Sequence, residues 1–317
     1  MINPDFSKVN RLVLIYPQGI TEGQYNYKSL IHFYDKLISM IPEDIELLLL
    51  CKSELPVPRL EQLHKNLTYT VIEDLQTIWI RDVAGFNCGD TIVKPIFKPK
   101  YYKGAFKKTD TIDRQMEGIS DFLGKKLRRM PITWDCGNLV TNGKIGIVTE
   151  RVLTDNPHLH KLDITAIIQE FLRIKPIFVP EAANDPLAHV DAYMSFINEK
   201  TAVVSKYPDN WFDDDRQYVG NLKSLLIEQD IEVIDVCDNP EDKFYCGIPS
   251  AKGVFVNFIQ INNHFLLPEY KFDTAHSSQD YNLEAKKVLR TFGKVLPINS
   301  DDLSKYGGVL HSISFCD

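Results

Sequence analysis

The chain has 317 residues, of which 44% are hydrophobic and 25% are charged, and its formal net charge is −7. This composition is typical of a globular protein whose core is large enough to fold without a structural metal or disulfide bonds. The acidic balance and the lack of a basic stripe argue against a nucleic-acid partner, and no apolar run is long enough to cross a membrane.

The six cysteines are scattered along the chain without a CxxC pair, so the sequence predicts neither a zinc site nor a disulfide framework. Scattered thiols fit a reducing compartment. The N-terminal stretch MINPDFSKVN lacks the basic start and apolar core of a signal peptide. We therefore expect a cytoplasmic protein.

Apolar runs rich in β-branched residues predict buried strands. In chain order, these runs cover residues 11–17, 45–51, 91–97, 144–149, 201–207, 254–261 and 264–270. Apolar residues at helical spacing predict helices between them. These helices cover residues 27–40, 115–127, 161–172, 216–229 and 282–292. A short strand is predicted after each helix, beginning near residues 45, 132, 177, 231 and 294.

The same unit therefore recurs five times, and an internal repeat takes precedence over local assignments. Polar or small-residue motifs follow the units about every 55 residues. These motifs are WIRD (79–82), DCGN (135–138), AHVD (188–191), CGIPS (246–250) and GGVLHS (307–312). Motifs in register indicate a ring of like modules around one axis, each offering its motif to the centre. A doubly wound α/β sheet would also alternate strands and helices, but it would not explain the register.

The chain has no GxGxxG, P-loop, HExxH or GxSxG motif, so Ser312 lacks the context of a serine-hydrolase nucleophile. Instead, WIRD, DCGN with TNGKIGIVTE, HVD and GGVLHS occur in a fixed order. On these motifs the chain resembles the agmatine deiminase and bacterial peptidylarginine deiminase family of the guanidine-modifying superfamily. The resemblance runs from about residue 70 to the end and is weaker before it.

The resemblance implies a five-bladed α/β propeller that forms a single domain over residues 1–317, with a central active site. It also implies a hydrolase, a guanidine iminohydrolase without a metal or an organic cofactor. The first expected substrate is agmatine, converted with water into N-carbamoylputrescine and ammonia through a covalent thiouronium intermediate, as in polyamine and putrescine biosynthesis. The only partner expected is a small cationic guanidine compound, and homo-oligomerisation stays open.

Other readings of the function remain. The substrate could be free arginine, peptidyl arginine or another guanidine compound. An amidinotransferase would use the same residues but pass the amidine to an amine. A non-catalytic guanidine-binding homologue is the alternative from outside the enzymes.

Two aspartates are candidates for binding the guanidinium, a planar cation whose forked N–H groups carboxylates can grip in pairs. By resemblance these are Asp82 and Asp191, although an ion pair with Arg81 or a capping role would explain them without function. His189 matches the family's general acid and base, and a core histidine is its ordinary alternative. If this segment is a strand, residues 189 and 191 point to the same face.

Asp135 stands where the family usually has glutamate, and the resemblance implies that its carboxylate orients the histidine. It is one methylene shorter, and the next residue is Cys136 instead of glycine; that thiol is interpreted as a buried structural group. Trp79 is expected to cover the guanidinium plane, unless it is only part of the core. Further departures are VAGF after WIRD, Ala188 in place of glycine, and a missing aspartate just before it.

Ser312 occupies the position of the family's nucleophilic cysteine. A thiol ionises readily beside cationic groups, whereas an alcohol needs a dedicated base. Cys316 is rejected as a substitute because four residues of strand span about 13 Å. Three explanations remain for the serine: an engineered inactivating change, a natural inactive homologue or a working serine variant. We expect the Ser312 chain to be inactive.

The residues that read the substrate's tail are not evident from the sequence. Residues 100–108 are basic and aromatic and carry Gly104, so they form either a lid or a solvated loop. Their positive charge would suit a substrate carboxylate better than the ammonium of agmatine.

Overall fold

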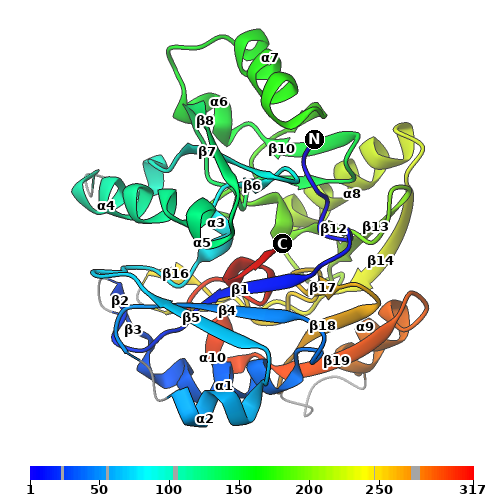
Figure 1. Cartoon of the computed structure of the whole chain (residues 1–317). Coiled ribbons are helices and arrows are strands. Elements are labelled where there is room, and N and C mark those ends of the chain that lie inside the picture. The colour runs from blue at the N-terminus through cyan, green and yellow to red at the C-terminus, as the bar shows by residue number, and fades with distance from the viewer. Residues whose placement is uncertain (23–24, 55–56, 103–105, 246, 273–278) are drawn as a thin grey trace. The chain divides into compact units, whose positions relative to one another are not determined.

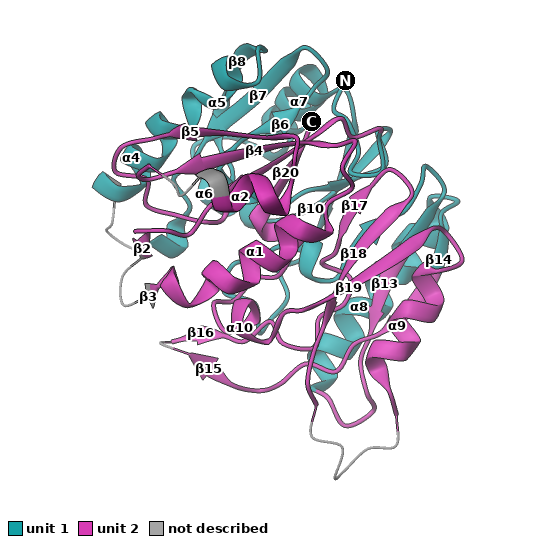
Figure 2. Ribbon diagram, turned by 60° about the horizontal axis from the view of Figure 1, so that its bottom comes forward, with its two compact units in different colours: residues 1–7, 81–202, 212–233 teal, residues 8–80, 203–211, 234–317 magenta. Residues whose placement is uncertain are grey.

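A computed structural model describes the whole chain except residues 23–24, 55–56, 103–105, 246 and 273–278. Helices and strands alternate from the N-terminus in blue to the C-terminus in red (Figure 1). The chain divides into two compact units, which Figure 2 colours separately. Unit 1 comprises residues 1–7, 81–202 and 212–233; unit 2 comprises residues 8–80, 203–211 and 234–317.

One sheet module occurs twice in unit 1. A short strand pairs antiparallel with a longer central strand, which pairs in parallel with the strand after the next helix. The two sheets consist of β6 (Phe86–Asn87), β7 (Thr91–Ile96) and β8 (Lys126–Thr133), and of β9 (Val140–Thr141), β10 (Ile145–Thr149) and β11 (Lys175–Val179).

The same module occurs in unit 2. One sheet consists of β17 (Ile259–Ile261), β18 (His264–Glu269) and β19 (Lys294–Asn299). The other consists of β20 (Ser314–Cys316), β1 (Arg11–Ile15) and β4 (Glu46–Cys51), extended by β5 (Leu67–Val71). Because β20 pairs antiparallel with β1, the last strand of the chain completes the sheet of the first.

A further sheet has the same strand order, with β12 (Met194–Phe196), β13 (Thr201–Lys206) and β14 (Glu232–Cys237). Two small hairpins consist of β2 (Thr21–Glu22) with β3 (Tyr25–Asn26), and of β15 (Phe244–Tyr245) with β16 (Ile248–Pro249). Within the described residues, the predicted repeat is therefore present as five sheets of common order. Their arrangement as a propeller and the single domain stay predictions.

Most of the helices in the described part of the chain follow an inner strand of a sheet or carry a motif. In chain order they are η1 (Tyr27–Leu30), α1 (Ile31–Met40), α2 (Val57–Leu63), α3 (Ile80–Val83), η2 (Lys100–Tyr102), α4 (Phe106–Glu117), α5 (Ile119–Phe122), α6 (Arg151–Asp155), α7 (Lys161–Leu172), η3 (Val190–Ala192), α8 (Asp213–Glu228), α9 (Tyr281–Leu289), α10 (Asp301–Ser304) and η5 (His311–Ile313). Within the described residues, no helix is long and apolar enough to cross a membrane.

The helix α7 has the bounds that the sequence predicts. Ile164, Ile168 and Leu172 recur at helical spacing and are all buried in the core of unit 1. At the start of the helix, the side chain of Asp163 accepts a hydrogen bond from the backbone N–H of His160 at 3.1 Å. A strong apolar period with a matching cap explains why sequence and structure agree here.

The predicted helix at residues 115–127 is wrong in part. The helix α4 begins earlier and ends at Glu117, and α5 stops before Gly124, which adopts a φ of +67°. The next residues form β8 from Lys126 onward. Because the first half of β8 carries charged and largely exposed side chains instead of an apolar run, no strand pattern is visible there in the sequence.

The predicted strand at residues 254–261 is also too long, because only Ile259–Ile261 form β17. Gly253 before it adopts a φ of +87°, and the N–H of Phe255 donates to Oδ1 of Asp238 at 2.9 Å. The first half of this apolar segment therefore satisfies backbone groups through a side chain and not through a strand ladder.

Candidate active site

Asp135 lies at the centre of a buried polar cluster in unit 1. It follows β8, and only 2% of the residue is exposed. Its Oδ1 atom accepts a hydrogen bond from the N–H of Gly137 at 3.0 Å. Its Oδ2 atom accepts a hydrogen bond from the hydroxyl of Tyr101 and lies 2.9 Å from Nε2 of His189. Both carboxylate oxygens thus have partners, which fixes the carboxylate against the imidazole.

The loop that carries His189 is held by the carboxylate of Asp185. It accepts hydrogen bonds from the backbone N–H groups of Leu187 and His189, both at 2.9 Å. Between them Ala188 adopts a φ of +56°, and Thr149 donates to its carbonyl oxygen at 2.8 Å. This left-handed conformation costs about 1–2 kcal/mol for a residue with a Cβ atom. Glycine would adopt this conformation without that cost, and the hydrogen bonds of Asp185 and Thr149 hold Ala188 in it.

Gly137 lets Asp82 and His189 approach the same space. A Cβ atom at position 137 would lie 2.7 Å from Oδ1 of Asp82 and 2.8 Å from Nδ1 of His189. These two atoms are 4.0 Å apart. The carbonyl oxygen of Asp82 also accepts a hydrogen bond from the N–H of Cys136 at 3.1 Å. The WIRD and DCGN motifs are therefore joined directly, and only glycine fits between their functional side chains.

The neighbours of these residues organise the loops. Arg81 forms an ion pair with Asp5 at 3.0 Å. The side chain of Asn138 exchanges two hydrogen bonds with the backbone of Thr149, at 2.9 and 3.4 Å. Arg81 and Asn138 thus hold the surrounding chain in place.

The prediction that His189 and Asp191 share a strand face is wrong. His189 is the N-cap residue of η3, with φ −89° and ψ 118°, and Asp191 lies within this 3-10 turn before β12 begins. The segment is too short to show a period of two or three residues in its sequence. Asp191 is nevertheless buried and close enough for its charge to act on the imidazole of His189.

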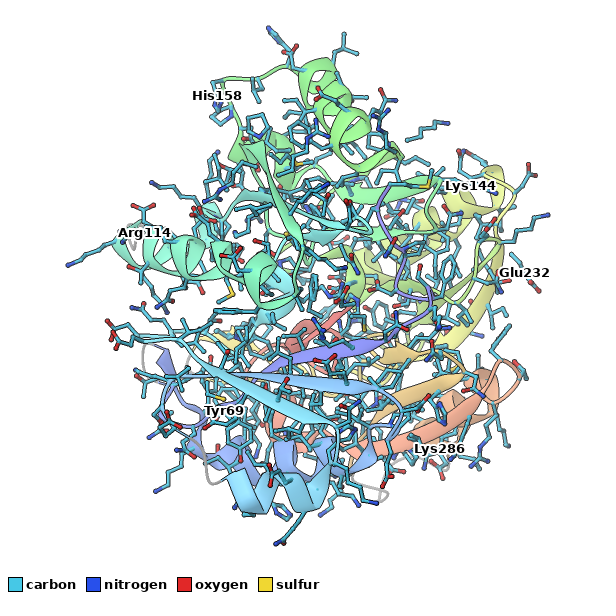
Figure 3. All side chains as sticks on the ribbon, viewed as in Figure 1. Tyr69, Arg114, Lys144, His158, Glu232 and Lys286 are labelled. Atoms are coloured by element: carbon cyan, nitrogen blue, oxygen red, sulfur yellow. The ribbon has the colours of Figure 1, made fainter. Side chains whose placement is uncertain are left out.

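Burial alone would lower the pKa of His189, but the charges of Asp135, Asp82 and Asp191 and the contact with Asp135 outweigh it. They raise the pKa well above its ordinary value, which favours the cationic form of the imidazole. His158 of the same unit is exposed and points outward (Figure 3). His189, in contrast, is buried among carboxylates, where it can hold a proton and deliver it inside a closed site.

The same cluster has the donor atoms of a metal site. One atom each from Asp82, Asp135 and His189 lie within 4.8 Å of one another. Carboxylate and imidazole groups at this spacing could hold a divalent cation. They could equally face the N–H groups of an organic cation. The prediction of a site without metal or cofactor stays a prediction.

Sequence reasoning missed Tyr101 as a member of this cluster. It lies in η2, within the residues 100–108 that the sequence presents as a lid or a solvated loop. Gly104, the predicted hinge, lies outside the described residues. The pair of Tyr101 and Asp135 joins positions far apart in sequence, and no motif or period signals it.

Unit 2 contains the other two predicted site residues. Ser312 lies in η5 and is 9% exposed. Its hydroxyl is 3.4 Å from Oδ1 of Asn257, to which the N–H of His311 also donates at 3.1 Å. Asn257 therefore holds the turn that carries position 312. It was missed because it lies within the apolar run that the sequence assigns to a strand.

Trp79 lies beside Gly308 in unit 2. A Cβ atom at position 308 would be 2.6 Å from the Trp79 ring and 3.2 Å from Cβ of Ser312. The ring of Tyr27 packs edge-on against Trp79, with centroids 6.5 Å apart. The structure thus brings the predicted aromatic residue and the predicted nucleophile position to the same glycine.

The fourth motif of the predicted register, CGIPS, was assigned to the wrong segment. Cys246 lies outside the described residues, and Ile248–Pro249 form β16 of a small hairpin. Asn257 lies two positions before the short strand of this module, just as Ser312 lies two positions before β20. The true register follows the short strands, which the sequence shows poorly because they have only two or three residues.

Cys136 offers no activated thiol that could replace a nucleophile at position 312. Burial raises the pKa of the Cys136 thiol far above its ordinary value, so the thiol stays protonated and fits the structural role predicted for it. Cys316 lies in β20 opposite Leu12 of β1. Residues 311–313 form a 3-10 turn, so the segment from 312 to 316 is only partly extended. The strand distance used to reject Cys316 as a substitute nucleophile therefore applies only in part.

The chain belongs to the Porphyromonas-type peptidyl-arginine deiminase family, whose model matches residues 1–315. This membership agrees with the family that the motifs predict. Among curated proteins, no sequence matches the chain significantly.

Solved structures of agmatine deiminases share its mixed α/β fold. A cysteine-to-serine variant of the C. jejuni agmatine deiminase with substrate bound is 18% identical, with a TM-score of 0.80 over 99% of this chain and 95% of that chain. The Enterococcus faecalis agmatine deiminase is 14% identical, with a TM-score of 0.81 over 100% of this chain and 95% of that chain. A second C. jejuni agmatine deiminase structure is 16% identical, with a TM-score of 0.76 over 99% and 95%.

Proposed function

We propose that this protein has the site of a guanidine deiminase, that the Ser312→Cys variant carries out the reaction, and that the Ser312 chain binds the guanidine substrate without turnover. The observation that carries the proposal is the buried cluster of unit 1, where Asp82 and Asp135 flank the imidazole of His189. Family membership and the shared fold of agmatine deiminases support the same class of reaction.

The carboxylates supply recognition. A guanidinium is a planar cation, and paired carboxylates bind its N–H forks with both charge and geometry. Asp82 and Asp191 are proposed for this role, as in the family. Trp79 is proposed to cover the plane of the cation, where a large aromatic face adds about 0.5–2 kcal/mol.

The reaction needs a nucleophile and a proton carrier. In the Ser312→Cys variant, the thiolate attacks the guanidinium carbon, and the C–N bond breaks as the imidazolium of His189 gives its proton to the leaving ammonia. Water then adds to the thiouronium carbon and gives one proton to His189. The C–S bond breaks to release the thiolate and a ureido product, and the remaining hydroxyl proton passes through solvent to the released ammonia, which leaves as ammonium. The carboxylates around His189 keep it protonated for the first step.

A serine at position 312 interrupts this sequence. Its hydroxyl lies 3.4 Å from the amide oxygen of Asn257, which is not a base. Without a dedicated base, an alcohol at neutral pH is a poor nucleophile. The C. jejuni agmatine deiminase with substrate bound carries a cysteine-to-serine change, a precedent for a serine form that holds substrate.

Agmatine remains the first substrate. Lys100 donates its ammonium hydrogen to the carbonyl oxygen of Thr154, and Lys108 lies over the Tyr102 ring at 5.3 Å. Two positive charges of this basic segment are thus engaged within the protein, which weakens the case for a substrate carboxylate. The product would be N-carbamoylputrescine, a polyamine precursor, formed in the cytoplasm. We also propose that the five modules are the blades of one propeller in a single domain.

The test is the Ser312→Cys variant, assayed for ammonia and for a ureido product with agmatine, free arginine and a peptide ending in arginine. Turnover of agmatine ahead of the others is expected. Ser314→Cys is the matched control, because it places a thiol in the same buried segment two positions away. Failure of Ser312→Cys with every guanidine would contradict the enzyme hypothesis, and consumption only with an amine acceptor would favour an amidinotransferase.

A further inference from the structure

The hydroxyl of Tyr101 and the imidazole of His189 meet on the same oxygen atom of a carboxylate. The Tyr101 hydroxyl donates to Oδ2 of Asp135, and Nε2 of His189 lies 2.9 Å from that oxygen. Oδ1, the other oxygen, accepts the N–H of Gly137. The tyrosine therefore competes directly with the imidazolium for the charge of one oxygen.

Tyr101 is held in this position from both sides. The preceding residue, Lys100, donates its backbone N–H to Oδ1 of Asp155 at 3.3 Å, which fastens η2 to the end of α6. The Tyr101 ring packs edge-on against the His189 ring at 6.4 Å and leans on Tyr102 at 5.3 Å. A side chain fixed by backbone and ring contacts delivers its hydroxyl to one place.

A general acid must bind its proton and also release it. The carboxylates around His189 favour the first task and oppose the second, because each raises the pKa of the imidazolium. A carboxylate oxygen that accepts another hydrogen bond carries less free charge and is a weaker base. A phenol that donates to Oδ2 of Asp135 hence loosens the proton on His189 without moving the carboxylate.

We propose that Tyr101 is a positioning residue that acts through Asp135 and moderates its hold on the His189 proton, so that the imidazolium can protonate the departing ammonia. The inference rests on the deiminase function proposed above. The shared oxygen atom carries it, since the hydrogen bond from the phenol and the ion pair with the imidazolium draw on the charge of the same oxygen.

The test is a pH titration of the His189 ring by NMR in the Ser312 chain, with the signal assigned by its loss in His189→Gln. Tyr101→Phe removes only the hydroxyl, and we expect it to raise the titration midpoint by at least about half a pH unit. Tyr102→Phe is the matched control, and it should leave the midpoint in place. An unchanged or lowered midpoint in Tyr101→Phe, or an equal rise in Tyr102→Phe, would overturn the proposal.

Two further readouts separate this role from a merely structural one. In Asp135→Asn, adding Tyr101→Phe should no longer move the midpoint, because the effect passes through Asp135. In Ser312→Cys, Tyr101→Phe should lower kcat about tenfold and leave KM within about twofold. The titration needs no turnover, so its result can be interpreted even if the deiminase assay fails. An effect of Tyr101→Phe on the midpoint that persists in Asp135→Asn would contradict the proposal.

Discussion

The two compact units hold their candidate residues by different forces. In unit 1, Asp82, Asp135 and His189 restrain one another through charge, and backbone donors fix their orientation. In unit 2, Ser312 and Trp79 are placed by shape, through a turn bonded to Asn257 and a glycine that admits the indole ring. We therefore expect the candidate residues of unit 1 to be sensitive to changes of charge and pH, and those of unit 2 to be sensitive to changes of side-chain volume.

The largest effect is expected from removing the proton carrier of unit 1. In the Ser312→Cys background, His189→Gln should reduce kcat about 10³-fold, because ammonia would have to leave without a positioned acid. Trp79→Leu in unit 2 should cost only about tenfold, mainly in KM. Steady-state ammonia release measures both. Equal losses of activity in the two variants would contradict the proposed difference between the charged and the aromatic residues.

Two glycine substitutions in the Ser312→Cys background compare the close contacts of unit 1 with those of unit 2. Gly137→Ala would put a methyl group 2.7 Å from Oδ1 of Asp82, and we expect it to reduce kcat/KM about 100-fold by misplacing the charged groups. Gly308→Ala would push on the Trp79 ring and should cost about tenfold, mainly in KM, because cation–π contact depends on the position of the ring.

Gly220→Ala is the control for these variants, because among the described residues nothing beyond the adjoining backbone of α8 lies within 4 Å of its added methyl group. It should leave activity unchanged and raise the free energy of unfolding by about 1 kcal/mol, as expected inside a helix. Steady-state kinetics and urea unfolding of all three glycine variants test these expectations. A fully active Gly137→Ala enzyme would show that the close approach around Gly137 is not needed.

The smallest expected effect is a pH dependence of stability. The pKa of His189 is raised in the folded protein above its ordinary 6.5, so its contribution to stability is fully present below that pH. It should be lost as the pH rises through the folded-state pKa. Urea unfolding between about pH 6 and about pH 10 should show a steeper decline of the free energy of unfolding for the Ser312 chain than for its His189→Gln variant. Parallel curves would mean that the carboxylates do not hold the proton.

Periodic and contiguous features could be predicted from the sequence. The apolar spacing of residues 161–172 predicts α7, and β-branched runs predict the central strands of the modules. The motif order points to Asp82, Asp135 and His189, which the structure brings together within unit 1. Periodic patterns and contiguous motifs depend on residues that are close along the chain, so they can be read from one sequence.

What could not be predicted depends on contacts between distant segments or on very short elements. Tyr101 reaches Asp135 from a turn that shows no periodic signal. Asn257 is hidden in an apolar run, and the strands that set the motif register have as few as two residues. The strand assumed around His189 is a 3-10 turn, because the left-handed Ala188 and the hydrogen bonds of Asp185 decide its local shape.

The most direct test of the proposed chemistry is to locate the covalent intermediate. The Ser312→Cys variant would be mixed with agmatine, quenched in acid and digested, and the peptides would be analysed by mass spectrometry. We predict an amidine adduct on residue 312 of the variant and no such adduct in the Ser312 chain. An adduct on Cys136 or Cys316 would contradict the claim that position 312 is the seat of the nucleophile, and turnover by the Ser312 chain itself would contradict its proposed inactivity.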